Sequence, residues 1–357
     1  MPPAERRLLL VLRALGLGDL LTALPALRAL RDAHPDHRIA LAAPRALHEL
    51  ALHSGAVDTA IDAAPLQPID LRGLPAPGIA VNLHGRGPQS TAVLRDTSPS
   101  RLVAFDAGAC PPRWRDDEHE VLRWCRLLGE GMGVATDPSR LDIAPPRNDV
   151  PRPAHGATLI HPGAAYAARR WPAERWAAVA REEQRRGHHV VVSGGAAEVD
   201  LARDVARRAG LRRDRVLAGS LSVLDLCATV AASARVVCGD TGVAHVATAL
   251  RRPSVVLFGP TPPSLWGPPP HPRHRVIWHG STGDSRAGST DPGLLRITVD
   301  EVLAELDALN EQANQAYADS SRRSLRSSSA DTARRSRTTQ GSPPTASRSA
   351  PSAVARP

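Results

Sequence analysis

The chain has 357 residues, of which 42% are hydrophobic but only 3% aromatic, and its formal charge is +9. This length accommodates two domains of ordinary size, with cores built mainly from Ala, Leu and Val. From Glu311 onward there are eight Arg against three acidic residues, so about +5 of the charge lies in that tail. The rest of the chain is only mildly basic, which argues against a protein that binds nucleic acid.

The cysteines and the apolar runs indicate in which cellular compartment the protein is expected. No C-x-x-C pair occurs, and the cysteines fall among helix and strand patterns, as reduced buried thiols do. The apolar run Leu8–Leu12 is too short for a signal peptide, and no run approaches the roughly 20 apolar residues that span a bilayer. We therefore expect a cytoplasmic protein with at most peripheral membrane contact. The four cysteines are Cys110, Cys125, Cys227 and Cys238.

The first half of the chain alternates strand and helix patterns, which is typical of a parallel α/β sheet. Leu8–Leu12 predicts a strand buried on both faces, and Leu20–Ala33 has helical spacing. Between them, the sequence LGLGD places Asp19 at the carboxyl end of the strand, where open α/β sheets bind ligands. A nicotinamide site is disfavoured, because the third glycine of G-x-G-x-x-G is missing and no acid follows the next strand, His37–Ala42.

A glycine loop with polar side chains, His84–Gly87, follows the predicted strand Ile79–Leu83. Its His84 and Arg86, with Gln89 and Ser90 at the start of the next helix, could face a substrate. The loop could equally be an ordinary glycine-rich turn. The remaining elements predicted in this half are helices at Arg45–Ser54 and His119–Leu128 and strands at Thr59–Asp62 and Leu102–Phe105.

The pattern then restarts after a linker. Four prolines in Ala144–Gly156 and the absence of apolar periodicity predict the linker. Beyond it a second doubly wound sheet is expected, in which Ser222 and Asp225 form a capping box and Pro262–Pro272 ends regular structure. Its predicted strands are Ala157–His161, His189–Ser193, Arg235–Cys238, Ser254–Phe258 and His274–His279, and its predicted helices are Ala173–Arg186, Ala197–Ala209, Ser222–Ala232 and Val243–Leu250.

The loop Gly239–Gly242 joins a strand to a helix in this second half. The free N–H groups and the dipole at such a helix start form an anion site. Gly242 lets the backbone approach a ligand, and Thr241 and His245 add polar side chains on the same side. In the alternative interpretation, Asp240 only caps the helix and His245 is a packed helix residue.

The C-terminal part divides into a helix and a polar tail. Thr298–Gln315 predicts an amphipathic helix. From about Ala318 onward the Ser-, Arg- and Pro-rich composition predicts disorder. The expected organisation is therefore a first Rossmann-like domain at 1–145, a linker at 146–156, a second Rossmann-like domain at 157–297, a helix at 298–317 and a tail at 318–357.

Two Rossmann-like halves, with LGLGD in the first and GDTGVAH in the second, resemble the GT-B glycosyltransferases of the heptosyltransferase family, glycosyltransferase family 9. The resemblance covers about Arg7 to Leu309. It implies an α/β fold with two doubly wound domains facing across a cleft. It also implies that Asp19 is the catalytic base, with Gly18 and the loop around His84 on the acceptor side.

The resemblance places donor binding in the second half. HPGAAYAARRWPAERW is similar to the donor-phosphate loop of the family, where a lysine stands two residues before Trp-Pro; Arg169 has that position here, and Arg170 is the alternative. Glu198 corresponds to the acid that contacts the ribose, unless it is a solvated acid in a first helical turn. Asp240, Thr241, Gly242 and His245 correspond to residues that hold the diphosphate and sugar, although Asp240 would repel phosphate and could instead cap the helix or accept from sugar hydroxyls.

The activity implied by the resemblance is inverting, metal-independent transfer of heptose or a similar sugar. The donor would be an ADP-heptose-like nucleotide sugar, and the acceptor a hydroxyl of a glycan or small molecule. No cofactor is expected, and the sequence has no D-x-D motif or His/Cys cluster that suggests a metal. The alternatives are a nucleotide-sugar epimerase of the same fold and a non-catalytic nucleotide-sugar binder. We expect a monomer.

Overall fold

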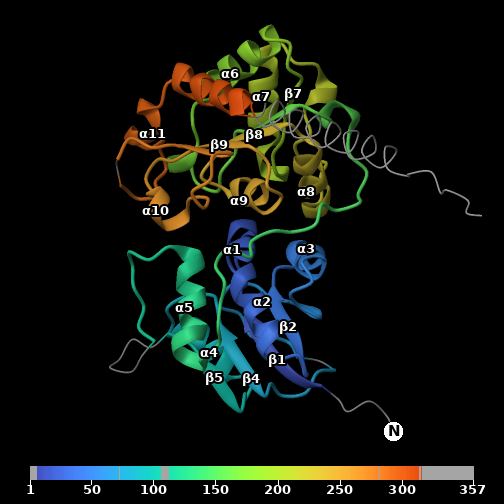
Figure 1. Cartoon of the computed structure of the whole chain (residues 1–357), viewed down its shortest axis with the longest axis vertical. Helices are drawn as coiled ribbons and strands as arrows, with labels where there is room; N and C mark the ends of the chain where they lie inside the picture. The colour runs from blue at the N-terminus through green and yellow to red at the C-terminus, as the bar shows by residue number, and fades with distance from the viewer. Residues whose placement is uncertain (1–5, 72, 106–111, 281, 313–314, 316–357) are drawn as a thin grey trace, which may run out of the picture. The chain divides into compact units, whose positions relative to one another are not determined.

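The computed structural model describes residues 6–71, 73–105, 112–280, 282–312 and 315. The chain up to Leu309 forms one compact unit that contains two parallel sheets. We call the part around the first sheet the N-lobe and the part around the second sheet the C-lobe (Figure 1). Cys110 and the tail for which disorder is predicted lie outside the described residues.

The N-lobe sheet has five parallel strands in the order β3-β2-β1-β4-β5. The central strand β1 is buried from Leu8 onward, as its uninterrupted apolar run predicts. The strand order reverses between β1 and β4, and a crevice for ligands opens at the carboxyl ends of such strands. The strands are β1 Arg7–Leu12, β2 His37–Ala43, β3 Thr59–Asp62, β4 Ile79–Asn82 and β5 Arg101–Val103.

The helices of the N-lobe differ from the predictions in two places. The single helix predicted at Leu20–Ala33 is wrong, because the chain forms two helices that break at Ala23. Pro25 has no N–H to continue the hydrogen-bond ladder of the first helix. The predicted helix Arg45–Ser54 begins instead as a 3-10 turn, Arg45–Leu47. The helices are α1 Leu17–Thr22, α2 Leu24–Ala33, α3 His48–His53, α4 Gln89–Arg95 and α5 Glu120–Met132.

The C-lobe sheet also has five parallel strands, in the order β10-β9-β8-β6-β7. Its order reverses between β6 and β8, so its crevice lies beyond His161 and Gly239. The strands are β6 Thr158–His161, β7 Val190–Val192, β8 Arg235–Gly239, β9 Ser254–Leu257 and β10 His274–Ile277. Together the two sheets confirm the predicted α/β class with two doubly wound halves.

The helices of the C-lobe are α6 Ala173–Arg185, α7 Val199–Ala209, α8 Val223–Ala232, α9 Gly242–Ala249, α10 Pro263–Trp266 and α11 Pro292–Arg296. Ser222 and Asp225 form the predicted capping box of α8. The prediction that Pro262–Pro272 lacks regular structure is wrong, because Pro263 begins the short helix α10. The first N–H groups of a helix have no partner within it, so a proline there costs no hydrogen bond. Residues 299–312 are helical, and their apolar face packs on the buried rings of Trp171 and Trp176.

The described cysteines are buried free thiols. Burial raises the pKa of Cys125 to about 11 and that of Cys227 to about 12.

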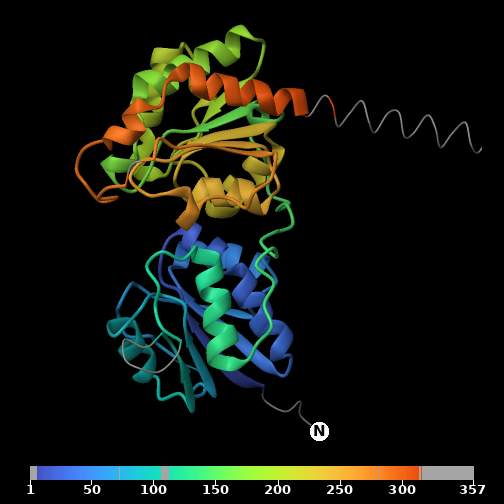
Figure 2. The ribbon, with the colours of Figure 1, turned by 60° about the vertical axis from the view of Figure 1, so that its left-hand side comes forward.

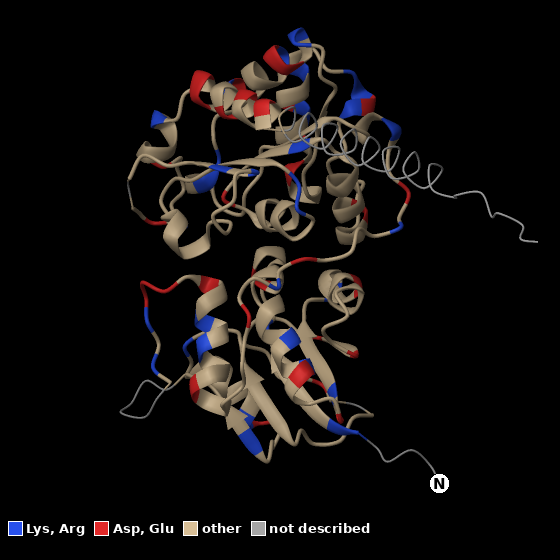
Figure 3. Cartoon of the chain, in the orientation of Figure 1, with Lys and Arg blue, Asp and Glu red and all other residues tan. Residues whose placement is uncertain are grey.

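Acidic and basic residues are interspersed on the helices of both lobes (Figure 3), as on α6, where Glu182 pairs with Arg185 and Arg186. In the part of the chain that the structure describes, no helix has the length and apolar composition needed to cross a membrane.

Candidate functional site

The candidate site lies where the N-lobe and C-lobe meet at the carboxyl ends of their strands. Helix α1 follows β1, helix α9 follows β8, and the two helices pack against each other (Figures 1 and 2). The same hydrophobic cluster contains Leu21 of α1 and Val246 of α9. The loops for which ligand contact is predicted therefore come together, although they are more than 200 residues apart in the sequence.

Two glycines permit this contact. A Cβ atom on Gly18 would lie 2.7 Å from Cδ2 of His245, and a Cβ atom on Gly242 would lie 2.9 Å from Cβ of Leu17. No side chain larger than hydrogen fits at either position without a shift. Gly18 thus contacts His245 directly, and Asp19 follows it in the first turn of α1.

A second contact between the lobes lies beside the first. His119, at the start of α5, has its Nε2 3.0 Å from the carbonyl oxygen of Gly267. A small pocket between these contacts is lined by Thr22, His119, His245 and Gly267, among others. The start of α5 is therefore part of the same region as α1 and α9.

Asp19 is held by two hydrogen bonds within the N-lobe. Its Oδ2 accepts from the Gly16 N–H at 3.0 Å, and its Oδ1 accepts from Nη2 of Arg13 at 3.2 Å. The side chain remains 26% exposed. A carboxylate has about four acceptor positions, so the two bonds leave room for Asp19 to receive a proton.

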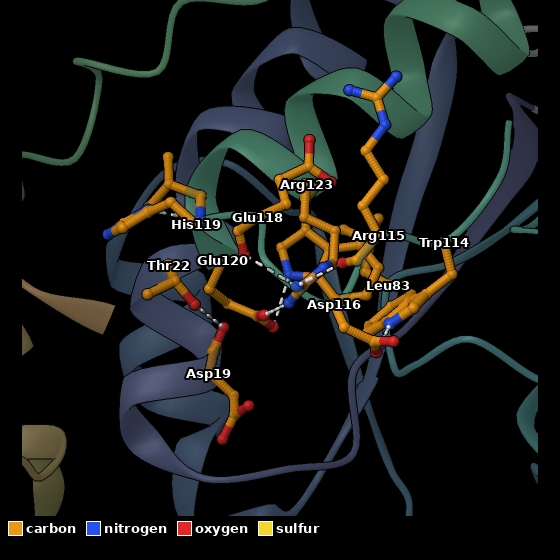
Figure 4. A network of polar contacts seen from close by, with 12 residues as sticks. Asp19, Thr22, Leu83, Trp114, Arg115, Asp116, Glu118, His119, Glu120 and Arg123 are labelled. Atoms are coloured by element: carbon orange, nitrogen blue, oxygen red, sulfur yellow. Dashed lines mark hydrogen bonds and ion pairs between the residues drawn. The ribbon is translucent and has the colours of Figure 1, made fainter. Parts of the chain in front are cut away.

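Sequence reasoning missed Arg13, which bonds to Asp19, and Glu120, which bonds to Arg13. Figure 4 shows Asp19 and Glu120 in one network of polar contacts. Arg13 is 1% exposed, and its Nη2 donates to Oε1 of Glu120 at 2.8 Å. Burial alone would raise the pKa of Glu120, but Arg13, Arg123 and Trp124 outweigh burial, so the pKa is lowered and the carboxylate stays ionised. An arginine directly after a buried strand was the available signal, but its partner follows 107 residues later.

The loop predicted to face an acceptor is partly structural. Nδ1 of His84 accepts from the Ala14 N–H at 3.2 Å, and the pKa of His84 is lowered by burial and then by Arg13. Arg86 and Gln89 are exposed. Ser90 is 3% exposed and accepts from Nδ2 of Asn82 at 2.9 Å. The expectation that Ser90 faces a substrate is therefore wrong, because this hydroxyl supports the loop from inside.

Arg169 and Asp240 lie side by side at the carboxyl end of β8. Nη1 of Arg169 is 3.7 Å from Oδ2 of Asp240 and donates to the backbone oxygen of the same residue at 3.3 Å. Nε of Arg169 is buried and has no hydrogen-bond partner among the described residues. Arg170 instead donates from Nε to the carbonyl of Ala164 at 2.8 Å. Arg169 thus lies beside Asp240 with a partly exposed side chain, whereas Arg170 has its Nε bonded to a backbone carbonyl.

Asp240 does not cap α9, so that interpretation is wrong. The N-cap of α9 is Thr241, and no side chain bonds to the first N–H groups of the helix. Asp240 is 6% exposed, and burial raises its pKa to about 6 even though Arg169 acts in the opposite direction. The start of α9 thus keeps free N–H groups next to a carboxyl group that is ionised only above about pH 6.

His245 is neutral at physiological pH. Burial lowers its pKa to about 4, and its ring lies 5.9 Å from that of Trp266. A neutral imidazole can donate or accept a hydrogen bond but carries no positive charge. The positive charge near the start of α9 therefore comes from Arg169 and the helix dipole.

Glu198 lies over the turn that follows β6. Its Oε2 accepts from the Gly195 N–H at 2.7 Å and lies 3.6 Å from Nε2 of His161. A Cβ atom on Gly163 would lie 2.1 Å from the Glu198 carboxyl carbon. The side chain is only 15% exposed, so the alternative of a solvated acid does not hold. His161, which sequence reasoning did not single out, is buried, and its Nδ1 is 3.0 Å from Oγ of Ser193.

No group of three or more His, Cys, Asp or Glu side chains that could hold a metal ion occurs within residues 6–71, 73–105, 112–280 and 282–312. The site consists instead of one partly exposed carboxylate on the N-lobe and, on the C-lobe, an arginine, a buried carboxyl group, a neutral imidazole and the start of a helix. This combination can bind an anion on one side and accept a proton on the other.

Two doubly wound lobes that meet through α1 and α9 form the GT-B fold. The family model of glycosyltransferase family 9 (heptosyltransferase) matches residues 98–289, which is more than half of the chain, and the chain belongs to this family. The family resemblance read from the two glycine loops is thereby confirmed.

Individual relatives show how far the likeness extends. The chain is 32% identical over 157 residues to lipopolysaccharide heptosyltransferase 2 of Escherichia coli (strain K12), which covers 42% of this chain and 45% of the relative. It is 30% identical over 204 residues to lipopolysaccharide heptosyltransferase 1 of Pseudomonas aeruginosa, or 56% of each chain. The matches thus span about half the length of these curated relatives.

A solved structure of E. coli ADP-heptose lps heptosyltransferase II superposes with a TM-score of 0.65 at 24% identity, covering 86% of this chain and 99% of the other. At this identity the superposition shows that the fold is shared.

Proposed function

We propose that the protein is a glycosyltransferase that moves heptose or a similar sugar from an ADP-heptose-like donor to a hydroxyl of a glycan or small molecule. The observation that carries the proposal is the contact between Gly18 and His245, because Asp19 directly follows Gly18 and His245 lies in the first half of α9, whose N-cap makes no side-chain hydrogen bond. Family membership and the ADP-heptose named for the related E. coli enzyme support the choice of donor.

In this proposal the C-lobe binds the donor. The diphosphate would accept from the N–H groups at Thr241 and Gly242 and from the partly exposed guanidinium of Arg169. The Thr241 hydroxyl and the neutral imidazole of His245 would also donate to the diphosphate, and the buried carboxyl group of Asp240 would accept from sugar hydroxyls. Hydrogen bonds to charged groups contribute about 1.5–3 kcal/mol each, so two or three of them suffice for micromolar affinity.

Asp19 would be the general base. It takes the proton of the acceptor hydroxyl while that oxygen bonds to the anomeric carbon, and the bond from that carbon to the diphosphate oxygen breaks. Attack from the face opposite the leaving group inverts the anomeric centre. The negative charge that develops on the leaving diphosphate is met by the start of α9 and by Arg169, so the proposed transfer requires no metal ion.

The donor assignment predicts a loss of nucleotide affinity in the double variant Thr241→Ala/His245→Ala. ADP should bind at least tenfold more weakly, because two polar contacts at the start of α9 are removed. Isothermal calorimetry with ADP measures the effect. Thr298→Ala/His279→Ala is a matched control, since these two residues contact Glu301 instead. Unchanged ADP affinity in the first variant would contradict the assignment.

The role of Glu198 in ribose binding predicts an effect of Gly163→Ala. The added methyl group would displace the Glu198 carboxylate from the turn after β6, and ADP affinity should fall about tenfold or more. The melting temperature should change little, because only the end of a flexible side chain has to move. Gly288→Ala is the control, since a Cβ atom there meets nothing within 4 Å. Retention of full ADP affinity in Gly163→Ala would show that Glu198 does not contact the nucleotide.

A further inference from the structure

Arg13 is the most heavily bonded side chain near the proposed base. It follows β1, and its guanidinium is 1% exposed. Nε donates to the backbone oxygen of Asp19 at 2.9 Å, Nη2 donates to Oδ1 of Asp19 at 3.2 Å, and Nη1 donates to the backbone oxygen of Leu83. One side chain thus connects the loop after β1, the first turn of α1 and the end of β4.

Glu120 holds Arg13 from the other side. Their closest contact is 2.8 Å, shorter than the 3.2 Å between Arg13 and the Asp19 carboxylate. Glu120 also accepts from Nε1 of Trp124 at 2.9 Å and from Arg123, and the Arg13 guanidinium lies over the Trp124 ring at 4.7 Å from its centroid. The position of Arg13 is therefore set by several contacts that do not involve Asp19.

The charges of this cluster favour Glu120 as the main partner of Arg13. Glu120 is 4% exposed and bonds to two arginines, whereas the Asp19 side chain is 26% exposed and has a second bond to the Gly16 N–H. Glu120 takes the shorter bond to Arg13 but also bonds to Arg123. The two arginines and Glu120 therefore keep one net positive charge, and the Asp19 carboxylate lies against it.

We propose that Arg13, held by Glu120, is a positioning residue for Asp19 in the transfer reaction. The inference rests on the proposed function. Arg13 bonds to Asp19 at the backbone and at the carboxylate, so it orients both the first turn of α1 and the side chain that receives the proton. Lysine cannot reproduce this role, because an ammonium group is a point charge without the planar fork of five donors.

The test is a double-mutant cycle that combines Arg13→Lys with Asp19→Asn. Transfer is measured as ADP release from ADP-heptose, with heptose-deficient lipopolysaccharide as the acceptor. Arg13→Lys should lower kcat about 10- to 100-fold, since misplacing a catalytic group by about 1 Å has an effect of that order. The KM for the donor and the calorimetric affinity for ADP should be unchanged. In the Asp19→Asn background the same substitution should change kcat by less than about threefold.

The matched control is Arg126→Lys. Arg126 also lies in the N-lobe and forms a partly buried ion pair, but its partners are Glu118 and Glu130 instead of Asp19. The Arg126→Lys substitution should leave kcat unchanged both in the wild-type protein and in the Asp19→Asn variant. Should Arg13→Lys fail to fold by circular dichroism, Glu120→Gln takes its place in the cycle. That variant keeps the side-chain shape but removes the charge that holds Arg13, and it should show the same dependence on Asp19.

Equal loss of kcat from Arg13→Lys in both backgrounds, or a wild-type kcat in the single variant, would overturn the positioning role. These results are distinct from failure of the proposed function. If the unaltered protein releases no ADP from ADP-heptose with this acceptor, the proposed reaction is wrong for that substrate pair. If it is active and the cycle is additive, only the role of Arg13 is wrong.

Discussion

Asp19→Asn is expected to lower the turnover of sugar transfer by about two to four orders of magnitude while leaving donor affinity unchanged. The asparagine amide oxygen can still accept from the Gly16 N–H, so the first turn of α1 keeps its capping bond. What is lost is the capacity to take a proton from the acceptor hydroxyl. The donor contacts lie on the C-lobe and are untouched by the substitution.

The measurement is single-turnover ADP release together with calorimetric ADP binding. Asp62→Asn is the matched control, because Asp62 is the last residue of β3 in the N-lobe sheet and also accepts from a backbone N–H, that of Arg45 at 3.0 Å. It should retain wild-type turnover. Turnover of Asp19→Asn near the wild-type rate would mean that another group is the base.

Asp240→Asn is expected to remove a pH dependence of stability. Burial raises the pKa of Asp240 to about 6 in the folded chain, from the ordinary aspartate value of 3.8. The folded state therefore binds this proton more tightly than the unfolded state does. The resulting stability is present below about pH 4 and is lost as the pH rises through about 6. A shift of about two pKa units corresponds to about 2–3 kcal/mol.

Urea unfolding at pH 4 and pH 7.5 tests this prediction. The difference in unfolding free energy between Asp240→Asn and the wild type should grow in favour of the variant by about 2–3 kcal/mol between these pH values. Arg169 lowers the pKa of Asp240, but burial outweighs this attraction and the pKa stays raised to about 6. Losing the attraction in Asp240→Asn therefore does not change the direction of the expected pH dependence. A constant difference across this pH range would show that folding does not raise the pKa of Asp240.

The fold was largely predictable because it depends on local patterns. The buried run of β1 and the glycine loop before α9 lie where the apolar periodicity places them. The break between α1 and α2 was missed, although Pro25 is visible in the sequence, because its neighbours keep helical spacing through it.

The sequence predicted which loops form the candidate site, but not which side chains bond to one another within it. Asp19 and Glu198 lie at strand ends, which the sequence indicates, but their partners depend on packing. The bond from Arg13 to Glu120 joins residues 107 positions apart. Buried Ser90 bonds to Asn82, and buried Asp240 lies 3.7 Å from Arg169. Such pairings follow from the tertiary arrangement and leave no periodic pattern in a single sequence.

The contact between the two helix starts also has an evolutionary consequence. Gly18 faces His245, and Gly242 faces Leu17, so each lobe limits the side chains allowed in the other. A lineage that acquires a side chain at position 18 should also carry a smaller residue at position 245, and a side chain at position 242 should accompany a smaller residue at position 17. Substitutions at these four positions should therefore covary across the family, even though each pair is separated by more than 200 residues.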